Sequence, residues 1–196
     1  MHISSVKGQP IVFLTSNWSK IELWIARNNA NCDVAAWLVD AILGTRARQH
    51  FRSSARTFPL HAAENYYSVS HSTVATVLAI SRAPIGVDIE QRIVNECLPD
   101  MVWALSAGER EEIRAEGGGN VLTEIWTAKE AAGKALGVGL LAMPSGFVSR
   151  AVPGMPSVRT VSVPATVADR TSVETCGVWI GDHHLRVAWG AVPEGG

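Results

Sequence analysis

Two carboxylates stand close together in the segment Ile85-Gly86-Val87-Asp88-Ile89-Glu90. Its apolar residues alternate with Gly86, Asp88 and Glu90, so a β-strand would place both carboxylates on one face, about 7 Å apart. Carboxylates at this spacing suit Mg²⁺, which also takes water and phosphate oxygens as ligands. In isolation the pattern is weak, because surface strands often alternate apolar and acidic residues for solubility alone.

A second candidate pair lies in the segment Trp126-Thr127-Ala128-Lys129-Glu130-Ala131-Ala132-Gly133-Lys134. In a helix Glu130 and Lys134 share one face, one turn apart, as an ordinary exposed ion pair also would. Two features favour a site: Trp126 lies one turn before Glu130, and Gly133 costs about 1 kcal/mol relative to alanine, which indicates close approach of a ligand or a strand. A third carboxylate and a lysine beside the first pair would form a site for metal-assisted phosphate chemistry.

The segment from Ala41 to Ala63 is basic and contains no acidic residue. Its basic side chains are Arg46, Arg48, His50, Arg52, Arg56 and His61. Such a run is often a solvated face or a loop, and it is also what a phosphate-binding patch requires.

Hydrophobic periodicity and turn residues predict the elements that position these groups. Helices are expected over 33–43, 106–115 and 121–136, the second starting at a capping box of Ser106 and Glu109. Strands are expected over 66–81 as strand, turn and strand, over 85–90, and as a hairpin of 173–180 and 185–192, with loops and short strands over 144–168. His183 and His184 are expected to be solvated at the hairpin tip. Helices and strands mix without regular β-α-β alternation, which favours the α+β class.

Composition limits the classes of protein that fit. The chain has 196 residues, of which 47% are hydrophobic, so it has enough apolar surface for one ordinary domain or two small ones. The net charge of -1 provides no global field for a nucleic-acid backbone, and no nucleic-acid partner is expected.

Cysteine usage and hydropathy bear on the compartment. Cys32, Cys97 and Cys176 are odd in number and far apart, which does not fit a disulfide framework, and they are expected to be buried thiols. The N-terminus lacks the pattern of a signal peptide, and the stretches without charged residues are too short and too polar or broken to span a bilayer. We expect a cytoplasmic protein with no membrane contact.

Three motifs in fixed order carry a family resemblance. They are Val69-Ser70-His71-Ser72, Pro84-Ile85-Gly86-Val87-Asp88-Ile89-Glu90, and Trp126 to Lys134. Together they resemble the signatures of 4′-phosphopantetheinyl transferases of the surfactin-synthetase-activating (Sfp-like) type. Each motif is modest alone, but their order and spacing are specific, and the resemblance covers about 33–148.

The resemblance implies a reaction. Enzymes of this type use Mg²⁺ to move the phosphopantetheine arm of coenzyme A to a serine of an acyl or peptidyl carrier protein, and they release 3′,5′-ADP. The apo carrier thereby becomes holo. The implied partners belong to polyketide, non-ribosomal peptide or fatty-acid pathways, and the compact length favours secondary metabolism such as antibiotic biosynthesis.

The resemblance also implies roles at the reacting centre. Asp88, Glu90 and Glu130 would hold Mg²⁺ against the coenzyme A pyrophosphate. Glu130, or a water that it positions, would take the proton from the carrier serine. Lys134 would stabilise or protonate the leaving phosphate.

Further roles concern the nucleotide. Ser70 and His71 would contact it, with His71 on the 3′-phosphate, and Lys129 is a further candidate phosphate contact. Where the family often has Gly-Lys-Pro before the first motif, this chain has Thr57-Phe58-Pro59. Arg52 or Arg56 would replace that lysine.

A second departure from the family lies in the early helix. Relatives place basic residues where this chain has Ala35-Ala36, which predicts weaker coenzyme A binding or a shifted mode. Arg27 and Arg46 are candidate replacements.

The implied architecture is α+β, with two similar α/β halves related by a pseudo-two-fold and the active site in the cleft between them. The halves would be 1–83, with the first motif, and 84–196, with the other two. Because that cleft lies within one chain, a monomer is expected.

Two alternatives stay open. One is a coenzyme A-binding interaction module with impaired turnover, motivated by Phe58 and Ala35-Ala36. The other is a metal-dependent nuclease, since the carboxylates and lysine also suit phosphodiester hydrolysis. The low basic content and the first motif speak against the nuclease.

Overall fold

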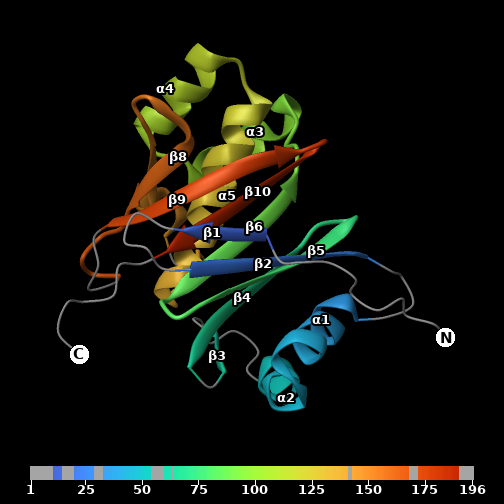
Figure 1. The fold of residues 1–196 in the computed structure, drawn as a ribbon. Coiled ribbons are helices and arrows are strands. Elements are labelled where there is room, and N and C mark those ends of the chain that lie inside the picture. Colours follow the sequence, from blue (N-terminus) through green and yellow to red (C-terminus); the bar gives the residue numbers. More distant parts are fainter. Residues whose placement is uncertain are drawn as a thin grey trace.

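The computed structural model describes residues 11–14, 20–28, 33–53, 60–62, 64–140, 143–167 and 172–189. Within these ranges the strands form two five-stranded antiparallel sheets, each with its own helices (Figure 1). Helices and strands are mixed, as predicted. The first sheet comes from the chain before Arg82 and the second from the chain after it. The division into two similar halves with a pseudo-two-fold stays a prediction.

The first sheet has the order β1-β2-β5-β4-β3. Its elements are β1 (Ile11–Leu14), β2 (Lys20–Arg27), α1 (Val34–Leu43), α2 (Thr45–Ser53), β3 (Leu60–Ala62), β4 (Asn65–His71) and β5 (Ala75–Ser81). Helices α1 and α2 cover one face, where Leu38, Ala47 and Tyr67 are buried in a common core. The predicted helix at 33–43 is confirmed, and Asp33 caps it by accepting a hydrogen bond from the Ala36 backbone N–H at 2.9 Å.

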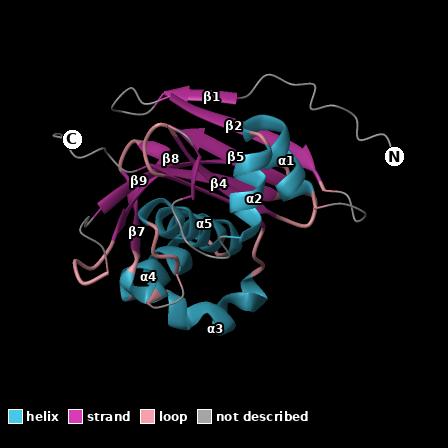
Figure 2. Ribbon diagram, turned by 90° about the horizontal axis from the view of Figure 1, so that it is seen from below, coloured by secondary structure: helices cyan, strands magenta, loops and turns pink. Residues whose placement is uncertain are grey.

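The second sheet has the order β6-β10-β9-β8-β7. Its strands are β6 (Ile85–Gln91), β7 (Val148–Val152), β8 (Met155–Ser162), β9 (Ser172–Ile180) and β10 (His183–Trp189). Its helices are η1 (Asn95–Cys97), α3 (Leu98–Met101), η2 (Val102–Ala104), α4 (Ala107–Glu116), α5 (Gly119–Leu136) and η3 (Pro144–Gly146). In Figure 2 the helices form two groups, α1 with α2, and α3 with α4 and α5.

Strand β6 joins the two sheets. Its predicted apolar face, with Ile85, Val87 and Ile89, packs against residues of β2 and β5 in a core between the sheets. Its other face lies against α5. A Cβ on Gly86 would stand only 1.9 Å from the Ala131 carbonyl oxygen, so glycine at this position lets the helix lie directly on the strand.

The helix predictions hold with small shifts. The capping box of Ser106 and Glu109 is present, and α4 ends at Gly117 in the left-handed conformation. Helix α5 begins at Gly119, two residues earlier than predicted, and is capped by Gly137.

The expectation for Gly133 is wrong about what approaches it. A Cβ there would lie 3.0 Å from the Gly139 carbonyl carbon, which belongs to the turn after α5 and to neither a ligand nor a strand. That turn folds back because the Val138 and Gly139 N–H groups both donate to the Gly133 carbonyl at 3.1 Å.

The histidine and cysteine expectations are also corrected. His184 is only 1% exposed because strand alternation turns it toward α5, where its Nδ1 lies 2.8 Å from Thr127 Oγ1. Burial, with nearby Arg186 as the next cause, lowers the pKa of His184 to about 3. Cys97 is exposed and Cys176 is half-buried, whereas Cys32 lies outside the described residues.

The membrane expectation concerns helices. In the described part of the chain, none of the helices combines the length and the hydropathy that a membrane span needs.

Candidate active site

Asp88 of β6 and Lys134 of α5 are brought together across the contact that Gly86 permits. Lys134 Nζ donates to Asp88 Oδ1 at 2.8 Å and to the Val87 carbonyl at 3.0 Å. The Asp88 side chain is 4% exposed and that of Lys134 is 14% exposed. Solvent therefore screens this ion pair little, and the predicted meeting of the strand motif with the helix motif occurs.

Glu90 and Glu130 belong to the same electrostatic cluster. Burial raises the pKa of Glu90 to about 7, and the negative charge of Asp88 is the next cause. Lys134 and a hydrogen bond with Trp126 oppose this rise, while Glu130 adds to it. The pKa of Glu130 is raised by burial and then by Asp88, with Lys134 opposing. The negative charge of Asp88 thus disfavours the ionised form of both glutamates, and the Lys134 ammonium group favours it.

The donor set fits a divalent cation that also has other ligands. Asp88 Oδ2 is buried and has no hydrogen-bond partner in the described part of the chain, which leaves a carboxylate oxygen for a ligand. Among the described residues, no three His, Cys, Asp or Glu side chains stand together as a complete metal site. Mg²⁺ commonly takes one or two protein carboxylates and completes its shell with water and substrate phosphate oxygens.

Ser70 of β4 enters the site by a contact that was not predicted. Its hydroxyl donates to Asp88 Oδ1 at 2.8 Å and accepts from the Ile89 N–H at 3.3 Å. The side chain is buried, at 7% exposure. The next residue, His71, is exposed, so the structure leaves its ring open to a ligand.

Lys129 is not part of this cluster. Its side chain is fully buried, and Nζ donates to Glu109 Oε2 at 2.8 Å, to the Ala104 carbonyl at 2.6 Å and to the Pro144 carbonyl at 3.1 Å. An ammonium group has three donors, and all three are used here. Burial lowers the pKa of Lys129, with Glu109 opposing. The predicted phosphate contact at Lys129 is corrected to an interior, structural role.

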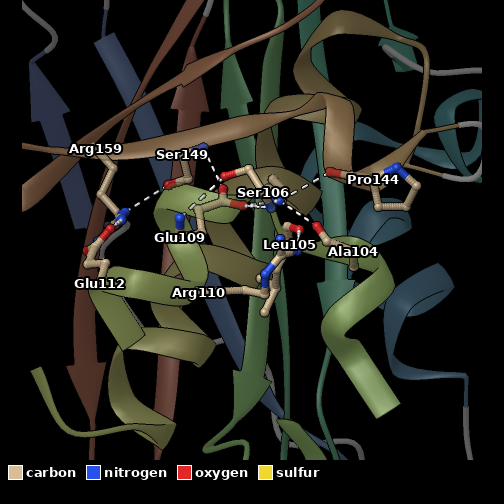
Figure 3. A network of polar contacts seen from close by, with 10 residues as sticks. Ala104, Leu105, Ser106, Glu109, Arg110, Glu112, Pro144, Ser149 and Arg159 are labelled. Carbon is tan, nitrogen blue, oxygen red and sulfur yellow. Dashed lines mark hydrogen bonds and ion pairs between the residues drawn. The ribbon is translucent and has the colours of Figure 1, made fainter. Parts of the chain in front are cut away.

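Glu109 is the residue that sequence reasoning missed in this network (Figure 3). Besides the ion pair with Lys129, Oε2 accepts from the Ser106 N–H and Oε1 from the Ser149 N–H, each at 2.7 Å. Glu109 thus links the start of α4 and strand β7 to Lys129, the residue before Glu130. The capping-box spacing was the only signal for Glu109 in the sequence.

Part of the basic segment forms α2, in which Arg46 and Arg52 are exposed and Arg48 is half-buried. Arg52 lies 3.5 Å from Asp33 Oδ2, and Arg48 pairs with Asp40 at 3.1 Å. Arg56 and Phe58 lie outside the described residues. The described contacts of Arg52 lead to the start of α1 and not to Asp88.

Comparison with known protein families settles the assignment. A family model described as "ACPS: 4'-phosphopantetheinyl transferase superfamily" matches residues 84–185, a little more than half of the chain. The chain belongs to the 4′-phosphopantetheinyl transferase superfamily. Members of this superfamily are transferases that use coenzyme A as substrate, generally with Mg²⁺. No curated protein matches the chain.

The superfamily match covers only part of the candidate site. It includes β6 and α5, and with them Asp88, Glu90, Glu130 and Lys134. It begins after Ser70 and His71, so the roles of these two residues rest on the geometry and on the motif resemblance.

Proposed function

We propose that this superfamily member is an active enzyme of the surfactin-synthetase-activating type. It transfers the 4′-phosphopantetheine arm of coenzyme A to a serine of an acyl or peptidyl carrier protein and releases 3′,5′-ADP. The observation that supports this best is the Asp88–Lys134 contact inside the superfamily match, with Asp88 Oδ2 left unpaired. We further propose a cytoplasmic monomer that acts on carriers of secondary metabolism.

Asp88, Glu90 and Glu130 are the proposed Mg²⁺ ligands; Asp88 offers the unpaired Oδ2, and the two glutamates, which do not stand together with it as a complete site in the metal-free structure, would join it when the ion binds. When bound, the ion would neutralise charge on the coenzyme A pyrophosphate. Burial and then the charge of Asp88 raise the pKa of Glu90 and of Glu130, and a bound cation would offset both effects, which supports this assignment.

Glu130 is also the proposed base, directly or through a water. A general base works best when its pKa is near the pH at which the enzyme operates, and the pKa of Glu130 is raised in that direction. The carrier serine oxygen forms a bond to the phosphorus that bears the pantetheine arm, and the bond from that phosphorus to the leaving 3′,5′-ADP breaks. The serine proton goes to Glu130.

Lys134 is proposed to stabilise the leaving phosphate. Two of its three donors are bonded, to Asp88 and to the Val87 carbonyl. The third donor has no acceptor among the residues that the structure describes, so it could meet the charge that develops on the leaving oxygen.

The nucleotide side of the site is proposed from the first motif and the basic helix. His71 is the proposed contact to the 3′-phosphate. Arg52 and Arg56 are proposed to replace the family's lysine, and the exposed pair of Arg52 with Asp33 is weak enough to be exchanged for a phosphate.

A second candidate is a coenzyme A-binding module with impaired turnover. Ala36, where relatives carry a basic residue, is fully buried in α1, so its side chain offers nothing to a phosphate. Fewer phosphate contacts would weaken the binding of coenzyme A and hold it less firmly for the transfer reaction.

Release of 3′,5′-ADP separates these candidates. The protein is incubated with coenzyme A, Mg²⁺ and apo carrier proteins, and nucleotide products are quantified by chromatography, with a carrier whose acceptor serine is replaced by alanine as the control. We expect 3′,5′-ADP only with the serine carrier. Binding of coenzyme A without release supports the impaired module, and release with the alanine carrier indicates hydrolysis in place of transfer.

A further inference from the structure

Strand β6 is an edge strand, and β4 of the other sheet completes its hydrogen bonding. Among the described strands, β6 pairs with β10 alone. On its other side the Val87 N–H donates to Ser68 Oγ at 3.0 Å, and the Ile89 N–H donates to Ser70 Oγ at 3.3 Å. Ser68 and Ser70 stand two residues apart on β4, so both hydroxyls face the same edge. Each of the two serine hydroxyls therefore accepts one hydrogen bond from a backbone N–H of β6.

The two serines differ in one contact. The Ser70 hydroxyl donates a hydrogen bond to Asp88 Oδ1 at 2.8 Å. Among the described residues, the Ser68 hydroxyl is hydrogen-bonded only to the backbone of β6. Ser70 and Lys134 thus both donate to the same carboxylate oxygen. One donor from strand β4 and one from helix α5 thus fix the Asp88 carboxylate, and Oδ2 has no hydrogen-bond partner among the described residues.

This arrangement leaves Ser70 with nothing to donate to a nucleotide. A hydroxyl has one proton, and a phosphate needs donors. The Ser70 proton is already held by Asp88, and the side chain is 7% exposed. A nucleotide contact would require breaking a buried, charge-assisted hydrogen bond.

We infer that Ser70 is a positioning residue for Asp88 and not a nucleotide contact. Its hydroxyl holds Oδ1, so that Oδ2 is the oxygen offered to a divalent cation. The inference rests on the proposed function for its kinetic consequences, while its consequences for Mg²⁺ binding are independent of turnover. His71 remains the nucleotide contact of this motif.

The test compares Ser70→Ala with Ser68→Ala, which removes a backbone bond of the same kind but leaves Asp88 untouched. Four quantities are measured: the Mg²⁺ dissociation constant by calorimetry, the coenzyme A dissociation constant, and the kcat and KM for transfer. We expect Ser70→Ala to weaken Mg²⁺ binding and lower kcat, each by about tenfold, with coenzyme A binding and KM within about twofold of wild type. Ser68→Ala should resemble wild type in all of these.

If Ser70→Ala fails to fold, a comparison of Ser70→Thr with Ser70→Val tests the same hydroxyl. The two side chains have the same shape, and only threonine keeps the hydroxyl, so threonine should restore Mg²⁺ affinity relative to valine.

Several results would overturn the inference. A raised coenzyme A dissociation constant or KM with unchanged kcat in Ser70→Ala would make Ser70 a nucleotide contact. Equal Mg²⁺ affinity in wild type, Ser70→Ala and Ser68→Ala, including no binding in all three, would remove the positioning role. If wild type transfers nothing, the proposed function fails separately, and the Mg²⁺ and coenzyme A dissociation constants still decide the role of Ser70.

Discussion

Lys134 Nζ lies 2.8 Å from Asp88 Oδ1, although the two residues are 46 positions apart in the chain. The contact exists because α5 lies directly on β6 at Gly86. Around it the structure gathers Glu90 and Glu130, whose pKa values are raised, and a buried serine from the other sheet. The proposed chemistry depends on this one strand–helix contact.

Replacing Lys134 with methionine should lower kcat by about a hundredfold or more, because the leaving phosphate loses its cation. It should also cost about 3 kcal/mol of unfolding free energy, since Asp88 stays buried without its ion partner. Steady-state kinetics and urea unfolding measure the two effects. Lys134→Arg, which keeps the charge, should keep the stability better than the activity. Transfer at the wild-type rate in Lys134→Met would remove the residue from the mechanism.

Replacing Gly86 with alanine should separate the two halves of the site. The added Cβ would meet the Ala131 carbonyl oxygen at 1.9 Å, so α5 must move away from β6, at a cost of about 3 kcal/mol. Gly108→Ala is the control, because among the described residues no atom beyond its chain neighbours and its own helix backbone lies within 4 Å of a Cβ there, and alanine should stabilise by up to about 1 kcal/mol. Thermal unfolding of both variants tests this, and equal stabilities would contradict the close contact.

Mg²⁺ binding should release protons near neutral pH. Without metal, Glu90 has a pKa of about 7, so a substantial fraction is protonated at about pH 6.5, and a bound cation would favour the ionised form. Calorimetry in two buffers with different ionisation enthalpies counts the protons. Glu90→Gln should abolish most of the release. Binding with no proton release at that pH would argue against Glu90 as a ligand.

The same shift predicts how stability depends on pH in the metal-free protein. Between the ordinary glutamate pKa of 4.5 and the raised pKa of about 7, the folded chain keeps the Glu90 proton that the unfolded chain has lost. This stabilising contribution is therefore complete below about pH 4.5 and is lost as the pH rises through 7. Relative to Glu90→Gln, wild type should lose melting temperature from about pH 5 to about pH 8. A gain over that range would reverse the sign and contradict the burial of Glu90.

Lys129→Met should destabilise the protein by about 3–5 kcal/mol, because Glu109 would remain buried with no cation. Adding Glu109→Gln should recover part of this loss, which a double-mutant cycle measures. The KM for coenzyme A should not change in folded variants. A folded Lys129 variant with a large rise in that KM would restore the predicted phosphate contact.

The local elements followed from sequence pattern because their causes are local. Strand alternation predicts β6, the capping box predicts the start of α4, and Gly137 ends α5 as expected. The motif resemblance brought Asp88 together with Lys134 before any geometry was known.

What sequence did not reveal depends on distant neighbours. Lys129 stands in the same motif as Glu130, and only the packing of η2, α4 and η3 around it shows that it is interior. His184 follows a turn, yet the pairing of β10 with β6 and β9 buries it. The motif suggests a ligand contact for Ser70, and only the packing of β4 against β6 shows that its hydroxyl donates to Asp88. Each of these depends on contacts between elements that periodicity does not encode.

The most direct test of the proposed transfer is the intact mass of a purified apo carrier protein after incubation with this protein and coenzyme A, with Mg²⁺ or with a chelator. We predict that the carrier gains one phosphopantetheine arm with Mg²⁺ and none with the chelator. An unchanged mass across acyl and peptidyl carriers, with the protein folded, would contradict the proposal.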